Sequence, residues 1–168
     1  MATKDRGIFF LRAILGLGML FAGLDKFFMW ANGHVFTSVG FLAKATGGQW
    51  LGSTTPVNPT QGIWTGIAAN PGLVSLFDTL VVFGEIAIGV TLILGLATRF
   101  SAVACTALMA LLFVSNWSFA NGPFNEQFMY GAIAATIAFV GAGAYALDTV
   151  IEKLAITQRF PAVRYVLG

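Results

Sequence analysis

The chain has 168 residues and a net charge of +2, with 57% hydrophobic and only 10% charged residues. A soluble domain usually carries about 25% charged residues, so an ordinary water-soluble fold is excluded and a polytopic membrane protein is expected. The small net charge, without a run of Lys and Arg, also excludes a nucleic-acid-binding class. One cysteine, Cys105, and one histidine, His34, cannot supply an intrachain disulfide, an iron–sulfur site or two axial histidines to a haem, which leaves only a His–Met pair as iron ligands. We therefore expect no bound metal or haem, and any redox centre is a diffusible molecule or belongs to a partner.

Four apolar stretches are each long enough to cross a bilayer as a helix, which takes about 20 residues. We expect these spans over residues 8–30, 73–97, 100–119 and 127–147. A long loop, residues 31–72, separates the first two spans, and a tail, residues 149–168, follows the last. The predicted fold class is all-α, a four-helix membrane bundle that forms a single domain. The first stretch is expected to be a retained helix, because no small-x-small cleavage site follows it.

Positive charges indicate the orientation of the chain. Lys and Arg cluster at the first span, in the second loop and in the tail, as Lys4, Arg6, Arg12, Arg99, Lys153, Arg159 and Arg164. The first loop has one, Lys44, and the third loop has none. The positive-inside rule then predicts both termini in the cytoplasm and the long loop outside. We expect the membrane to be the cytoplasmic membrane of a prokaryote. We expect a short helix over residues 36–45 of that loop, an irregular stretch over 47–60, and an interfacial helix in the tail that contacts membrane lipids.

Two predicted spans carry charged residues on one face. In the first span Arg12, Gly16, Met19, Gly23 and Lys26 follow one another at steps of four and three residues, which keeps them on one side of a helix. In the second span Asp78 and Glu85 share a face, and Gly89 lies one turn further on. A charge near the centre of a bilayer costs roughly 3 kcal/mol, so each of these groups needs a partner or a task.

Two interpretations of this arrangement stay open. Lys26 and Asp78 are expected at similar depth, so they can form an ion pair that sets the register of the two helices. Glu85 lies 12 residues from either end of its predicted span, and no cation is expected at that depth. A central carboxyl without a full partner suits a hydrogen bond to a quinone, or proton relay. The glycines either permit close helix packing or leave room for a flat head group.

Further polar residues are expected near the outer end of the bundle. Asp25 lies at the level of Lys26, and Glu126 opens the fourth span with Tyr130 one turn later. Glu126 and Tyr130 can join an outer polar cluster, although a tyrosine at an interface also fits a membrane belt. The candidate catalytic residues are Glu85 and Lys26. The candidate quinone-binding residues are Arg12, Gly16, Gly23, Asp25, Asp78, Gly89, Glu126 and Tyr130.

Several short motifs together resemble the DoxX/DoxD membrane family. The first span contains LRAILG and AGLDKF, the second contains Gly84-Glu85 and ends in the turn Thr98-Arg99-Phe100, and the last region contains NEQ, GAG and Leu147-Asp148. The long first loop is more similar to the DoxD type. The resemblance implies the small membrane subunit of a thiosulfate:quinone oxidoreductase, which works with a DoxA-like second subunit and passes electrons from thiosulfate to quinone.

Two functional hypotheses follow. In the first, the chain is a subunit of a quinone-linked oxidoreductase, and a diffusible quinone enters between the first two helices to meet Glu85 and Lys26. In the second, the chain is a non-catalytic scaffold of a larger membrane complex, which the missing cofactor ligands and the long loop favour. The sequence leaves open whether the chain also forms a homo-oligomer.

Overall fold

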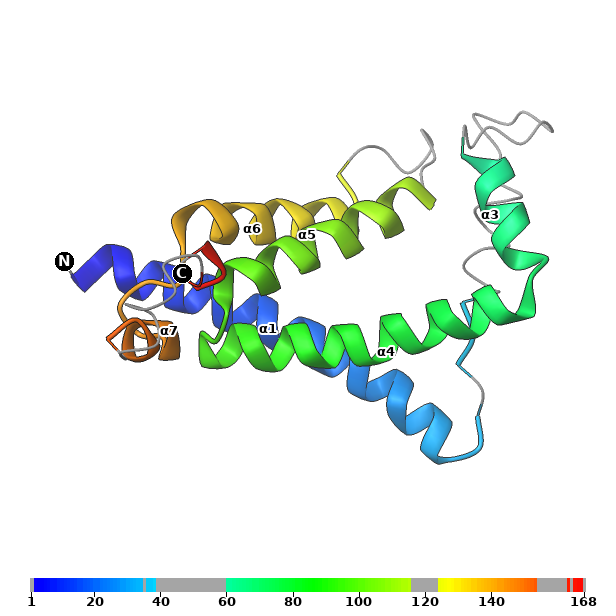
Figure 1. Ribbon diagram of the computed structural model, residues 1–168, viewed down its shortest axis with the longest axis horizontal. Helices are drawn as coiled ribbons and strands as arrows, with labels where there is room; N and C mark the ends of the chain where they lie inside the picture. Colours follow the sequence, from blue (N-terminus) through cyan, green and yellow to red (C-terminus); the bar gives the residue numbers. More distant parts are fainter. Residues whose placement is uncertain are drawn as a thin grey trace.

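The computed structural model describes residues 2–34, 36–38, 60–115, 124–153, 163 and 165–167. Within these residues the chain is helical and contains no strand, as the composition predicted. The helices, drawn in Figure 1, are α1 (Ala2–Ala31), α3 (Gln61–Ala68), α4 (Pro71–Leu94), α5 (Thr98–Ser115), α6 (Glu126–Val140) and α7 (Leu147–Ile151).

Three helices are long and apolar enough to cross a membrane: Thr3–Ala31 within α1, and the whole of α4 and α5. The fourth predicted span, 127–147, is shorter than expected, because α6 ends at Val140. Gly141 follows with a φ of 89°, a backbone conformation that glycine adopts readily and that ends the helix. The 15 residues of α6 extend about 22 Å, less than the roughly 30 Å of a hydrocarbon core. The fourth complete span therefore stays a prediction. The cytoplasmic position of both termini also stays a prediction.

Local signals in the sequence explain where two helices begin. The Asn70 side chain accepts hydrogen bonds from the backbone N–H groups of Gly72 and Leu73 at 3.0 and 3.3 Å, and Pro71 occupies the first turn of α4. The Asn125 side chain accepts from the backbone N–H of Phe128 at 2.9 Å and caps α6. Both helices thus begin at a capping residue that can be recognised in the sequence.

The long loop contains a helix that the sequence analysis missed. Helix α3 lies in residues 31–72, and its Trp64 is buried against Val74 of α4, with Phe77 packed alongside. The helix predicted over 36–45 is not present in residues 36–38, and the rest of it lies outside the described residues. The irregular stretch predicted over 47–60 also lies outside them, except for Thr60. In the tail, α7 occupies Leu147–Ile151, and much of the predicted interfacial helix is again outside the described residues.

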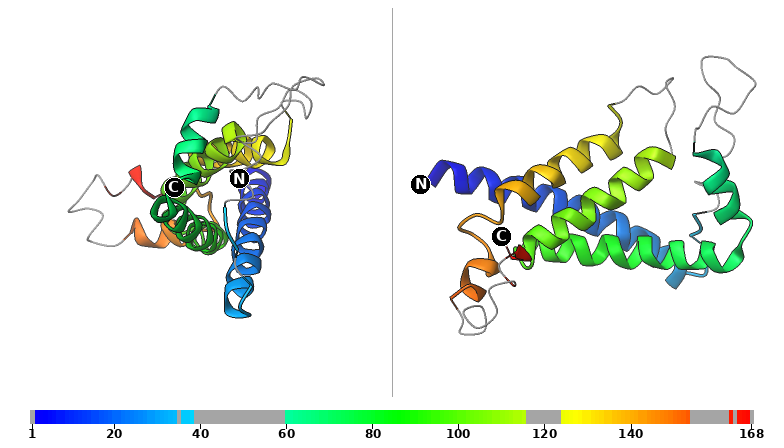
Figure 2. Two further views of the ribbon diagram at one scale, coloured as in Figure 1. Left: turned by 90° about the vertical axis from the view of Figure 1, so that its right-hand side faces the viewer. Right: turned by 45° about the horizontal axis from the view of Figure 1, so that its top comes forward.

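The helices pack in two close pairs, α1 with α4 and α5 with α6. Between the pairs a buried core contains Leu15, Met19, Ile88, Leu92, Ala102, Cys105, Met109, Ala134 and Ile137. Cys105 is part of this core and is fully buried. Helices α4 and α5 are antiparallel neighbours joined by a tight turn, and they diverge away from it (Figures 1 and 2).

Candidate functional site

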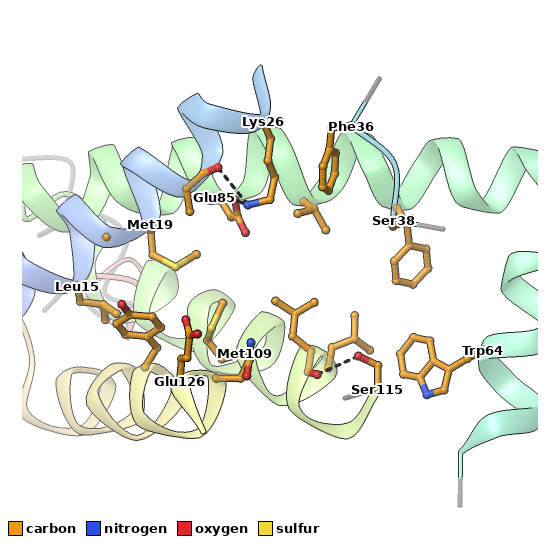
Figure 3. Close-up of a pocket in the computed structure, with 18 residues that line it drawn as sticks. Leu15, Met19, Lys26, Phe36, Ser38, Trp64, Glu85, Met109, Ser115 and Glu126 are labelled. Atoms are coloured by element: carbon orange, nitrogen blue, oxygen red, sulfur yellow. Dashed lines mark hydrogen bonds and ion pairs between the residues drawn. The ribbon is translucent and has the colours of Figure 1, made fainter. Parts of the chain in front are cut away.

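A cavity of about 280 Å³ lies between the two helix pairs. It is on the side where the long loop leaves α1 and enters α4, and α3 contributes to its wall (Figures 1 and 3). Its lining is mostly apolar, with a few polar side chains, and consists of Leu15, Gly18, Met19, Ala22, Lys26, Phe36, Ser38, Trp64, Phe77, Val81, Glu85, Met109, Leu111, Leu112, Ser115, Glu126, Gln127 and Tyr130. Small-molecule pockets typically have this character and volumes of about 300–1,000 Å³, so the cavity is near the lower end of that range.

An ion pair between α1 and α4 forms part of the cavity wall (Figure 3). The Lys26 Nζ atom lies 2.6 Å from Oε2 of Glu85 and also donates to the carbonyl of Ala22 at 3.1 Å. The Lys26 side chain is 21% exposed and that of Glu85 is 5% exposed. The Phe36 ring lies over the ammonium group, 5.7 Å from ring centre to Nζ.

The prediction that Lys26 pairs with Asp78, and that Glu85 has no cation at its depth, is therefore wrong. Depth was counted from backbone positions, whereas helical side chains lean toward the N-terminus of their helix. The long stem of Lys26 runs back over the turn that contains Ala22, and this brings its ammonium group to the level of Glu85. Both residues still face the cavity together, as the quinone hypothesis requires.

Asp78 has a different partner from the one predicted. Its carboxylate Oδ1 accepts a hydrogen bond of 2.6 Å from the backbone N–H of Ser38. Asp78 is buried and lines a separate hollow with Trp30 and Phe36, rather than the cavity beside Glu85. It therefore holds the end of the loop segment 36–38 against α4.

Arg12 lies at the opposite end of the bundle and does not line the cavity. Its guanidinium group donates to the backbone carbonyls of Ala142, at 2.6 Å, and Tyr145. These carbonyls follow the break at Gly141, so they lack the partners that a continuing helix would provide. Arg12 thus satisfies the backbone where α6 ends, at a distance from the cavity that Glu85 lines.

Asp148 is a buried residue to which the sequence analysis gave no role. Its carboxylate accepts from the backbone N–H groups of Ala97 and Thr98, at 2.7 and 2.8 Å, and thereby caps the start of α5. Asp148 also donates its own backbone N–H to the carbonyl of Gly95 at 2.9 Å. An acidic residue directly after an apolar stretch was a signal that Asp148 needs a partner. The sequence did not show which partner, because the turn that Asp148 caps is 50 residues away.

The three glycines predicted at the site are packing positions. A Cβ atom at Gly89 would lie 2.5 Å from the backbone nitrogen of Leu20, and one at Gly16 would lie 2.9 Å from the carbonyl oxygen of Gly89. A Cβ atom at Gly23 would lie 2.8 Å from the nitrogen of Ile86. Close helix packing is thus the correct one of the two alternatives, and none of the three glycines lines the cavity.

The remaining predicted residues divide between the cavity and the surface. Glu126 and Tyr130 line the cavity from α6. Figure 3 shows Glu126 on the side of the cavity opposite the Lys26–Glu85 pair. Asp25 is exposed and is not part of the lining. Ser38, Trp64 and the other loop residues of the lining were missed, because no sequence pattern indicated where the loop folds back. Among the described residues, no three His, Cys, Asp or Glu side chains gather as a metal site would require.

Comparison with known families gives one match. The family described as the TQO small subunit DoxD matches residues 8–160. No curated protein and no solved structure is detectably similar to the chain. The match begins at residue 8, within α1, and extends beyond α7, so it includes the cavity, its ion pair and the turn that Asp148 caps. The chain belongs to the DoxD family of small membrane subunits, as its motifs indicated.

Proposed function

We propose that the cavity is a quinone site, and that the chain is the membrane subunit of an oxidoreductase that passes electrons from a sulfur compound such as thiosulfate to quinone. The observation that carries this proposal is the Lys26–Glu85 ion pair in the wall of a mostly apolar cavity between membrane helices. An apolar ligand alone requires no such pair, and a strongly charged ligand requires a more polar lining.

The chemistry of a quinone head group suits this wall. A quinone is a neutral, flat ring whose carbonyl oxygens accept hydrogen bonds, and its reduced form carries hydroxyl groups that donate them. Lys26 has three N–H donors, of which one is directed to Glu85 and one to Ala22. Lys26 can donate to a quinone oxygen and stabilise the negative charge that develops there on reduction. Glu85 can accept from a hydroquinone hydroxyl, and Met19 and Leu15 provide apolar contact with the ring.

The proposed reaction balances for two electrons. Two thiosulfate ions join through a new S–S bond to give tetrathionate and release two electrons. The quinone takes up these electrons and two protons and becomes hydroquinone. In this chain Lys26 and Glu85 orient the acceptor and lie where the protons arrive, while a DoxA-like second subunit completes the enzyme. Charge distribution along the sequence supports a site on the outer side of a prokaryotic cytoplasmic membrane.

The test is quinone binding and turnover in matched variants. Glu85→Gln keeps the shape of the side chain and removes its charge, and Lys26→Met keeps the stem and removes the donor. Asp25→Asn is the control, because Asp25 precedes Lys26 on α1 and is exposed. We expect the first two variants to weaken quinone binding and thiosulfate-dependent quinone reduction at least tenfold, since charge-assisted hydrogen bonds contribute about 1.5–3 kcal/mol. Wild-type binding and turnover in both variants would refute the proposal.

A non-catalytic scaffold is the second candidate, favoured by the fact that Lys26 already has protein partners in Glu85 and Ala22. An ion pair of this kind can serve only to fix α1 against α4. The scaffold hypothesis predicts that the charge changes alter thermal stability without altering quinone binding. It also predicts that deletion of residues 34–60 dissociates partner subunits, and an intact complex after that deletion would contradict it.

A further inference from the structure

The loop segment 36–38 is held at the cavity by contacts from two helices. The indole Nε1 of Trp30 donates to the carbonyl of Phe36 at 3.1 Å, and the backbone N–H of Ser38 donates to Asp78 at 2.6 Å. The Phe36 ring also lies over the Lys26 ammonium group. The segment is therefore fixed by α1 on one side and by α4 on the other.

The fixed segment presents an unpaired hydroxyl to the cavity. Ser38 is 7% exposed and lines the cavity, and Figure 3 shows it on the same side as Phe36. Among the described residues its Oγ atom has no hydrogen-bond partner, although the atom is buried. A buried hydroxyl without a hydrogen-bond partner costs about 1–3 kcal/mol. Its burial beside a cavity therefore indicates that a bound ligand forms the missing hydrogen bond.

We infer that the Ser38 hydroxyl contacts the ligand of the cavity, and that Asp78 is a positioning residue that acts through Ser38. This inference rests on the proposed quinone function and adds specificity to it. Lys26 and Ser38 are two donors in the wall of one cavity, so the ligand class they select is a neutral ring compound with carbonyl oxygens. Asp78 contributes by holding the Ser38 backbone and does not itself touch the ligand.

The test uses menadione, a naphthoquinone without a long tail, and the fluorescence of Trp64. Trp64 is buried and lines the same cavity, so a quinone bound there quenches its emission. The Trp64→Phe variant supplies the signal of the other tryptophans for subtraction. We expect Ser38→Ala to raise the Kd for menadione about three- to tenfold, the usual loss for one hydrogen bond. Ser38→Thr keeps the hydroxyl and is expected to restore binding.

A second ligand separates hydrogen bonding from shape. 2-Methylnaphthalene has the ring system of menadione without its carbonyl oxygens, and its affinity follows from displacement of menadione. Ser38→Ala is expected to leave that affinity unchanged. Equal weakening of both ligands, or wild-type menadione binding in Ser38→Ala, would overturn the inference.

The role of Asp78 has its own readout. Asp78→Ala is expected to weaken menadione binding to the same degree as Ser38→Ala, and the double variant is expected to be no weaker than either, because both changes remove one contact. Additive losses would show that Asp78 does not act through Ser38. If Glu85→Gln weakens menadione binding and Ser38→Ala does not, this inference fails and the quinone proposal stands. If the wild-type protein does not bind menadione, both fail.

Discussion

At Gly89 the backbones of α1 and α4 lie close together, and replacement of this glycine by alanine gives a direct test of the helix crossing. A Cβ atom there would lie 2.5 Å from the nitrogen and 2.7 Å from the Cα of Leu20, whereas real Cβ contacts stay beyond about 3.0 Å. Both atoms belong to the backbone, so rotation of a side chain cannot relieve the clash. The two helices must therefore separate by about half an ångström or more.

Overpacking of this kind usually costs about 1–3 kcal/mol, and we expect Gly89→Ala to lower the free energy of unfolding by that amount. Gly84→Ala is the control on the same helix, because a Cβ atom there meets nothing within 4 Å. Alanine favours a helix over glycine, so the control is expected to be neutral or stabilised by up to about 1 kcal/mol. The assay is unfolding of both variants in mixed micelles, followed by circular dichroism. Equal stability of the two variants would refute the close crossing.

Three further predictions concern buried groups away from the cavity. Arg12→Lys is expected to lower the melting temperature in detergent, because an ammonium group cannot reproduce the fork that reaches the carbonyls of Ala142 and Tyr145; an unchanged melting temperature would contradict this. Asp148→Ala is expected to destabilise the protein by about 1–3 kcal/mol by leaving the buried N–H of Thr98 and the half-buried N–H of Ala97 unpaired, and Asp148→Asn, which keeps one acceptor, by less. Cys105 is fully buried, so maleimide labelling is expected only after unfolding, and rapid labelling of the folded protein would argue against the observed packing.

The sequence was most informative where a short local rule applies. Asn70 and Asn125 marked helix starts because capping depends on residues two or three positions away. Glu85 and Lys26 were recognised as central because a charge inside an apolar stretch is rare and costly. These rules require no knowledge of the three-dimensional arrangement.

The features that the sequence did not predict depend on contacts between residues that are far apart along the chain. The Lys26–Glu85 pair spans 59 positions, and its formation depends on the direction of a flexible side chain and on the crossing of two helices. The backbone after the end of α6 is satisfied by Arg12, which lies 130 positions from Ala142, whose carbonyl it binds. Ser38 reaches the cavity only because the loop folds back, and no periodic pattern in the sequence predicts such a fold.

The place of the cavity follows from where the helices are tied together. At one end Arg12 binds α1 to the segment between α6 and α7, and Asp148 binds the first turn of α7 to the α4–α5 turn. Away from these contacts α4 and α5 diverge (Figure 1). The cavity is lined there by Val81 and Glu85 of α4 and by Met109 and Ser115 of α5. A ligand there contacts both helix pairs and the loop segment 36–38 together. Any partner subunit that binds this loop segment more tightly when a quinone is present must raise the quinone affinity by the same factor, because the linkage is reciprocal.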